Sequence, residues 1–87
     1  MSINITLPSV EEVNEWWPTD VVTFLGSNKK KLFLEDKHIK VIEDEEVAGS
    51  DFLVLDVEKL MKYGLKGGPA ERIAKLVRDI KGEDQGK

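Results

Sequence analysis

The chain has 87 residues, a formal net charge of −4 and no cysteine. This length fits one domain, and the lack of cysteine excludes a disulfide framework and a thiolate metal site. No apolar run approaches the roughly 18 residues of a membrane span, and the N-terminus lacks the basic start and apolar stretch of a signal peptide, so we expect an intracellular, cytoplasmic protein, with the nucleus as the alternative.

The N-terminal part of the chain predicts a leader and a first helix. Residues 1–14 are a leader of mixed character, in which Ser9, followed three residues later by a glutamate, can cap a short helical turn. Residues 18–27 are predicted to form the first helix, with either Trp17 or Thr19 as its cap residue.

The middle of the chain predicts a basic loop followed by short helices. Lys29–Lys31 are predicted to be an exposed loop. Residues 35–45 are predicted to form the second helix, with Ile39 and Ile42 on one face. Residues 49–54 are predicted to be a short third helix or turn.

Two more helices are predicted before the C-terminus. Asp56 is placed to cap a fourth helix over residues 57–63, with Leu60 and Met61 facing inward, and Gly64 is a natural left-handed stop. A longer fifth helix begins at Gly67-Gly68-Pro69, and its apolar stripe at helical spacing consists of Ile73, Leu76, Val77 and Ile80. We therefore expect an all-α fold, a compact five-helix bundle with a longer C-terminal helix, and a polar tail at residues 83–87.

Charge is divided unevenly along the sequence. Residues 34–58 carry nine acids and two lysines, whereas residues 59–82 carry seven bases and two acids. An acidic middle and a basic end would give a small domain an electric dipole that can steer two copies head to tail.

The order and spacing of the apolar and glycine positions from residue 15 to residue 82 resemble those of a sterile alpha motif (SAM) domain. The residues that carry the resemblance are Trp16, Val21, Phe24, Leu25, Ile42, Val47, Gly49, Phe52, Leu53, Leu55, Leu60, Gly64, Leu65, Gly68, Pro69, Ile73 and Ile80. The sequence departs from the family pattern at Trp17, where a small capping residue is usual, and at Gly67, where leucine is usual.

The resemblance implies a protein–protein interaction module that self-associates or pairs with another SAM domain by joining two different surfaces. The implied end-helix surface consists of Lys66, Gly67, Gly68, Pro69, Arg72 and Lys75. The implied mid-loop surface consists of Asp44, Glu45, Glu46, Asp51, Asp56 and Glu58. Because one surface is basic and the other acidic, we expect a head-to-tail contact that gives a homo-oligomer or an open filament.

The sequence also bears on two other classes of function, RNA binding and catalysis. Some SAM domains bind RNA hairpins with a basic patch around the last helix, and this is the alternative function; the acidic middle of the chain argues against a nucleic-acid partner. An enzyme is not expected, because the carboxylates cluster without an acid–base partner and a bundle this small has little room for a substrate pocket. We predict no catalytic, cofactor-binding or metal-binding residues.

Overall fold

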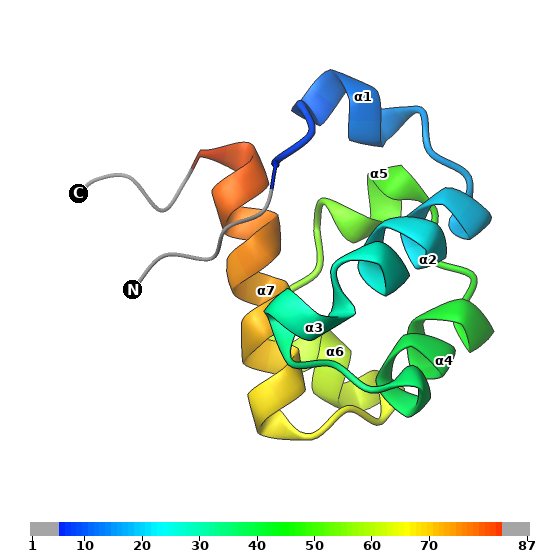
Figure 1. Cartoon of the computed structure of the whole chain (residues 1–87), viewed down its shortest axis with the longest axis vertical. Coiled ribbons are helices and arrows are strands. Elements are labelled where there is room, and N and C mark those ends of the chain that lie inside the picture. The colour runs from blue at the N-terminus through cyan, green and yellow to red at the C-terminus, as the bar shows by residue number, and fades with distance from the viewer. Residues whose placement is uncertain (1–5, 83–87) are drawn as a thin grey trace.

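The computed structural model describes residues 6–82, so the predicted tail at 83–87 and the first five residues of the predicted leader lie outside the described residues. Within the described range the chain forms seven helices and no strand (Figure 1). The helices are α1 (Val10–Asn14), α2 (Pro18–Ser27), α3 (Lys29–Leu32), α4 (Asp36–Asp44), α5 (Gly49–Phe52), α6 (Val57–Tyr63) and α7 (Gly67–Lys81).

The predicted starts and stops of several helices are confirmed. The Ser9 hydroxyl accepts a hydrogen bond from Glu12 N at 3.0 Å and caps α1. The Asp56 carboxylate accepts one from Lys59 N at 2.8 Å and caps α6, which ends at Gly64 with φ 118°. Each side chain satisfies a backbone donor that the first turn of a helix leaves without a partner.

The start of α2 resolves the choice between two cap residues. Trp17 occupies the cap position with an extended backbone, and Pro18 follows at the first helical position. The Asp20 carboxylate accepts a hydrogen bond from Trp17 N at 2.9 Å. The indole makes no capping hydrogen bond, because its one polar group is a donor and not an acceptor, and Trp17 is 73% exposed.

Two predictions about individual segments are wrong. Lys29–Lys31 are part of helix α3 and not a loop. Lysine is a good helix former, and the turn is fixed by Leu32, which is fully buried. Met61, predicted to face inward with Leu60, is 50% exposed, since one step along a helix rotates the side chain by about 100° away from its neighbour.

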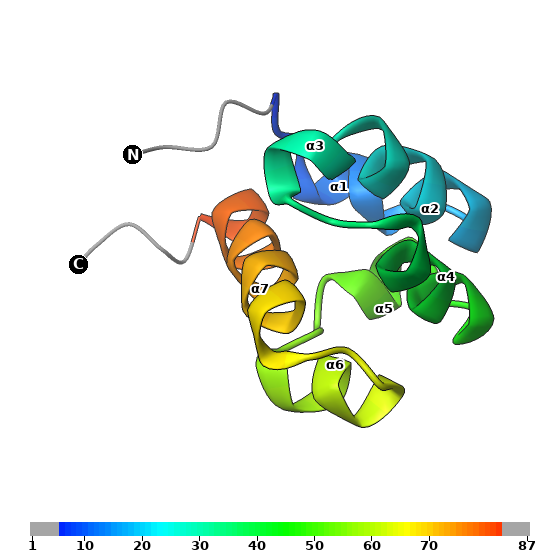
Figure 2. The same cartoon turned by 60° about the horizontal axis from the view of Figure 1, so that its bottom comes forward.

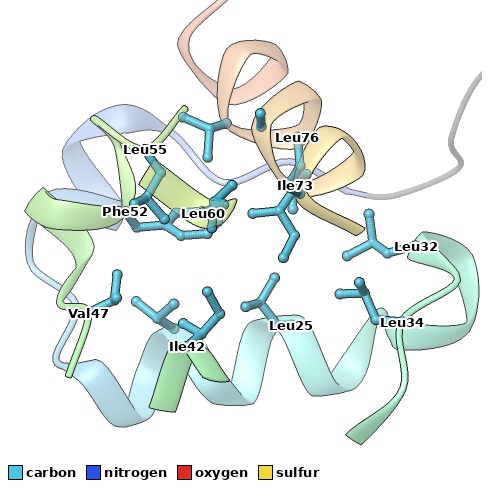
Figure 3. Packing of buried hydrophobic residues seen from close by; sticks show 14 of the residues in the cluster. Leu25, Leu32, Leu34, Ile42, Val47, Phe52, Leu55, Leu60, Ile73 and Leu76 are labelled. Atoms are coloured by element: carbon cyan, nitrogen blue, oxygen red, sulfur yellow. The ribbon is translucent and has the colours of Figure 1, made fainter. Parts of the chain in front are cut away.

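The hydrophobic core draws residues from every helix (Figure 3). Side chains of α2, α3 and α4 and the segments beside them point toward those of α5, α6 and α7. The predicted stripe of α7 is buried as a whole, with Ile73 in the centre of the core. The buried hydrophobic residues are Val13, Val21, Leu25, Leu32, Leu34, Ile39, Ile42, Val47, Phe52, Leu53, Leu55, Leu60, Leu65, Ala70, Ile73, Ala74, Leu76, Val77 and Ile80.

Helix α1 packs against α5 through a backbone contact. Gly49 N donates to the carbonyl oxygen of Trp16 at 3.0 Å. A Cβ atom at Gly49 would lie 1.7 Å from the Val13 carbonyl oxygen, so only glycine allows this approach. Val13 is fully buried, and the segment before α2 therefore supplies part of the core.

The arrangement of the helices separates two sides of the molecule. In Figure 2, α3 and α6 lie on opposite sides, and α7 runs along the flank between them. The C-terminal helix packs along α6, and α2 packs on α4. None of the helices in residues 6–82 has the length and apolar character needed to cross a membrane.

Candidate protein-binding surfaces

A surface groove of about 420 Å³ lies between the end of α4, the α5–α6 connection and α6. It brings together Glu45 and Asp51, two acids that the sequence analysis assigned to the mid-loop surface. Val54 adds an apolar patch to the wall and is 57% exposed. The lining residues are Glu45, Val47, Asp51, Val54, Leu55, Lys59 and Tyr63. We call this feature the mid-loop groove.

The only tyrosine of the sequence reports the electrostatics of the mid-loop groove. Partial burial raises the pKa of the Tyr63 hydroxyl above its ordinary value of 10.0, and the negative charges of Glu45 and Asp51 raise this pKa further. The groove is therefore an acidic environment that favours a cationic or neutral group over an anion.

The remaining acids of the predicted mid-loop surface have differing roles. Asp44 forms an ion pair with Lys40 at 2.7 Å, and Asp56 is occupied as the cap of α6. Glu58 lies 3.9 Å from Lys62. Glu46, like Glu45, forms no ion pair within residues 6–82, and neither do Asp51 and Asp56, whose carboxylates accept backbone hydrogen bonds from Ala48 N and Lys59 N.

The predicted end-helix surface also contains a groove, of about 510 Å³, along α7. Gly68, Arg72 and Lys75, three of the residues assigned to this surface, line it together with Val57, Glu71 and Arg78. The Lys75 ammonium lies 3.2 Å from both carboxylate oxygens of Asp79. This groove shares no lining residue with the mid-loop groove, so one molecule presents two separate surfaces.

The other three residues predicted for the end-helix surface lie apart from this groove. Lys66 lines a neighbouring hollow with Lys37 and His38. Gly67 is half-buried, and Pro69 is buried beneath the first turn of α7. The side chain of Pro69 therefore shapes the start of the helix and does not contribute exposed surface.

The half-buried Arg72 side chain binds the backbone of a distant part of the chain. Its Nε donates to the Leu32 carbonyl oxygen at 2.7 Å, and its Nη2 donates to the Phe33 carbonyl oxygen at 2.8 Å. Both carbonyls belong to the end of α3, where a helix leaves acceptors without intrahelical partners. The guanidinium thus fastens α3 to α7, a role that the sequence did not predict.

Phe33 is a surface residue that the sequence analysis missed. It is 75% exposed, whereas its neighbours Leu32 and Leu34 are buried. Its backbone is left-handed, with φ 55° and ψ 44°. A run of three apolar residues between two helices gives no signal for which member faces outward, and the orientation depends on the left-handed turn.

Residues 6–82 contain no group of three or more His, Asp or Glu side chains that could hold a metal ion. Each buried side-chain nitrogen or oxygen in this range has a hydrogen-bond partner. The geometry consists of two exposed grooves of different charge on an apolar bundle, which is an arrangement suited to binding another protein.

Residues 6–82 form a small helical domain with two exposed grooves. The sequence model of the SAM-like domain family matches residues 1–79, and the chain belongs to this family. It is 28% identical over 81 residues to sterile alpha motif domain-containing protein 9 of Homo sapiens. This match covers 93% of the chain but 5% of the human protein. No solved structure matches the chain significantly.

Proposed function

We propose that this domain is a protein–protein interaction module that self-associates, or pairs with another SAM domain, head to tail. The acidic mid-loop groove of one copy would contact the basic end-helix surface of the next. Since the two surfaces differ, the contact is heterologous and builds an open chain of copies.

The observation that carries this proposal is the separation of charge between two surfaces that share no residue. Glu45 and Asp51 face the mid-loop groove, and Lys66 and Lys75 lie on the end-helix surface. The N-terminus of α7 adds partial positive charge there, because its first backbone N–H groups lack helical partners. Complementary surfaces of this kind raise association rates and exclude partners of the wrong charge.

The structure gives less support to RNA binding. Arg72, one of the basic side chains expected to contact phosphates, donates instead to two carbonyl oxygens of the chain itself. The chain carries a formal net charge of −4, which opposes binding to a phosphate backbone. Protein binding therefore remains the function that the geometry supports best.

The test is sedimentation velocity of the purified chain from micromolar to millimolar concentration, at low and high salt. We expect wild-type protein to grow in size with concentration and to grow less at high salt, because exposed charges are screened within about 8 Å at physiological ionic strength. Glu45→Lys should block the mid-loop groove and Lys66→Glu the end-helix surface. An equal mixture of the two variants should form dimers through the surfaces that remain intact.

Glu15→Lys is the matched control for Glu45→Lys. Both glutamates are exposed residues at the C-cap of a helix, so the two substitutions change charge and helix-end electrostatics alike. Assembly that persists in both Glu45→Lys and Lys66→Glu would refute the assignment of the surfaces. A wild-type chain that stays monomeric at millimolar concentration would exclude self-association and direct the search to a different SAM domain.

A further inference from the structure

The backbone conformation of Phe33 is unusual for its residue type. Within residues 6–82 the non-glycine residues with positive φ are Phe33 and Glu46, both at φ 55°. Left-handed positions after a helix are usually taken by glycine or asparagine, because a bulky side chain is strained there. One of these two residues lies beside the end-helix surface and the other on the predicted mid-loop surface.

The strain at Phe33 is not offset by burial of its ring. The residue is 75% exposed, so the ring contributes little to the hydrophobic core. A strained residue held at the surface is an observation that points to a function for its side chain. The conformation is maintained from outside the turn, since Arg72 Nη2 binds the Phe33 carbonyl oxygen.

The surroundings of Phe33 are basic. Lys30 and Lys31 are exposed three and two residues before it, and the Arg72 guanidinium donates a hydrogen bond to its carbonyl oxygen. An exposed aromatic ring with basic residues on its N-terminal side and at its carbonyl oxygen fits an apolar site with an acidic rim. The mid-loop groove has Val54 in its wall and Glu45 and Asp51 beside it, and Lys59 is the one base among its lining residues.

We propose that Phe33 is the apolar anchor of the assembly and enters the mid-loop groove of a second copy of this chain. This inference rests on the proposed head-to-tail function and adds the residue that dominates the contact. Aromatic side chains that fill a pocket often supply most of the binding energy of an interface, and the charges around them supply orientation.

The insertion must occur between molecules. Phe33 follows α3, and the mid-loop groove is built partly on α6, which lies on the opposite side of the molecule in Figure 2. A copy cannot fill its own groove, so each copy donates one ring and accepts another. Further copies can therefore be added at either end of the assembly until Phe33 or the mid-loop groove of the end copy is blocked.

The decisive variant is Phe33→Asn in the full chain, studied by sedimentation velocity and thermal unfolding together. Asparagine tolerates the left-handed backbone, so Tm should rise while the dissociation constant for self-association increases at least about tenfold. A purely structural role for Phe33 predicts a lower Tm instead. Trp17→Ala is the control, because Trp17 is equally exposed but lines neither groove, and it should leave association unchanged.

A second variant tests the other half of the contact. Val54→Gln removes the apolar wall without changing charge, and it should weaken association about as much as Phe33→Asn does. An equal mixture of Phe33→Asn and Val54→Gln chains should recover dimers, because each variant retains one intact partner surface. If wild type assembles and Phe33→Asn assembles equally well, the anchor is refuted and head-to-tail pairing stands. If wild type does not assemble, both proposals fail for a second copy of this chain.

Discussion

Arg72 Nη2 donates a hydrogen bond of 2.8 Å to the carbonyl oxygen of Phe33, although 39 positions separate the two residues in the sequence. Together with the bond from Nε to the Leu32 carbonyl oxygen, this contact fixes the end of α3 on the side of α7. The same guanidinium therefore stabilises the fold and positions an exposed aromatic ring. Substitutions of Arg72 are therefore expected to lower the stability of the fold, so a loss of binding in such variants does not by itself identify a binding residue.

The first prediction concerns this link between α3 and α7. Arg72→Ala should lower the free energy of unfolding by about 1–2 kcal/mol, because two carbonyl oxygens lose their donors. Arg72→Lys should recover only part of the loss, since an ammonium lacks the planar fork of donors. Urea unfolding measures both variants, with the exposed Lys30→Ala as a control that should change stability little. Equal stability of Arg72→Ala and wild type would show that the link contributes nothing.

The second prediction compares two glycines, one with no room for a Cβ atom and one with open space around it. Gly49→Ala should lower the free energy of unfolding by about 1–3 kcal/mol, because its Cβ would collide with the Val13 carbonyl oxygen. Gly26→Ala in α2 should raise it by about 0.4–1 kcal/mol, since no atom lies within 4 Å of the new Cβ and alanine favours a helix. Chemical denaturation of both variants gives the two signs directly. A neutral Gly49→Ala would mean that α1 and α5 do not interlock as described.

The third prediction concerns the left-handed turn after α4. Glu46→Asn should raise the free energy of unfolding by up to about 1 kcal/mol, because asparagine adopts positive φ more readily than glutamate. Glu46→Ala is the control: it removes the same charge, but alanine does not share the tolerance of asparagine for positive φ, so it should not give this gain. Thermal unfolding at low protein concentration separates the effect from self-association. Equal gains in both variants would assign the effect to charge and not to backbone strain.

The fourth prediction is a pH dependence. The pKa of Tyr63 is raised in the folded chain, so the folded state holds this proton more tightly than the unfolded state. Its contribution to stability is complete below the unfolded value of about 10 and is lost as the pH rises through the folded pKa. Because the sequence has one tyrosine, ultraviolet absorbance of the phenolate reports this group alone. Glu45→Gln should lower the pKa of Tyr63, whereas Glu15→Gln, at the end of α1, should not.

The fold could be predicted from the sequence to the extent that signals were local. The cap at Asp56, the stop at Gly64 and the stripe of Ile73 and Ile80 each depend on spacing within one or two helical turns, and all are confirmed. Helix α3 was missed because three successive lysines look like a solvated loop. Its helical state depends on Leu32 reaching the core, which is a tertiary effect.

The candidate surfaces were harder to predict because they depend on contacts between distant residues. The sequence places Glu45 and Asp51 in one acidic block, and the structure brings both to one groove. It gives no sign that Val54 and Lys59 join them, or that Arg72 is engaged by Leu32 and its neighbour. The exposure of Phe33 could not be predicted from the sequence either, because local preferences do not favour a left-handed backbone at phenylalanine.

The close approach of Gly49 to the backbone around Val13 determines which piece of chain can be moved between proteins as a unit. A fragment that starts at residue 15 would lack the fully buried Val13 and would leave the face of α5 uncovered. The portable module therefore begins no later than Ser9, which caps α1, and extends through the last turn of α7. A graft that begins at residue 15 should fold poorly even though it keeps every lining residue of both grooves.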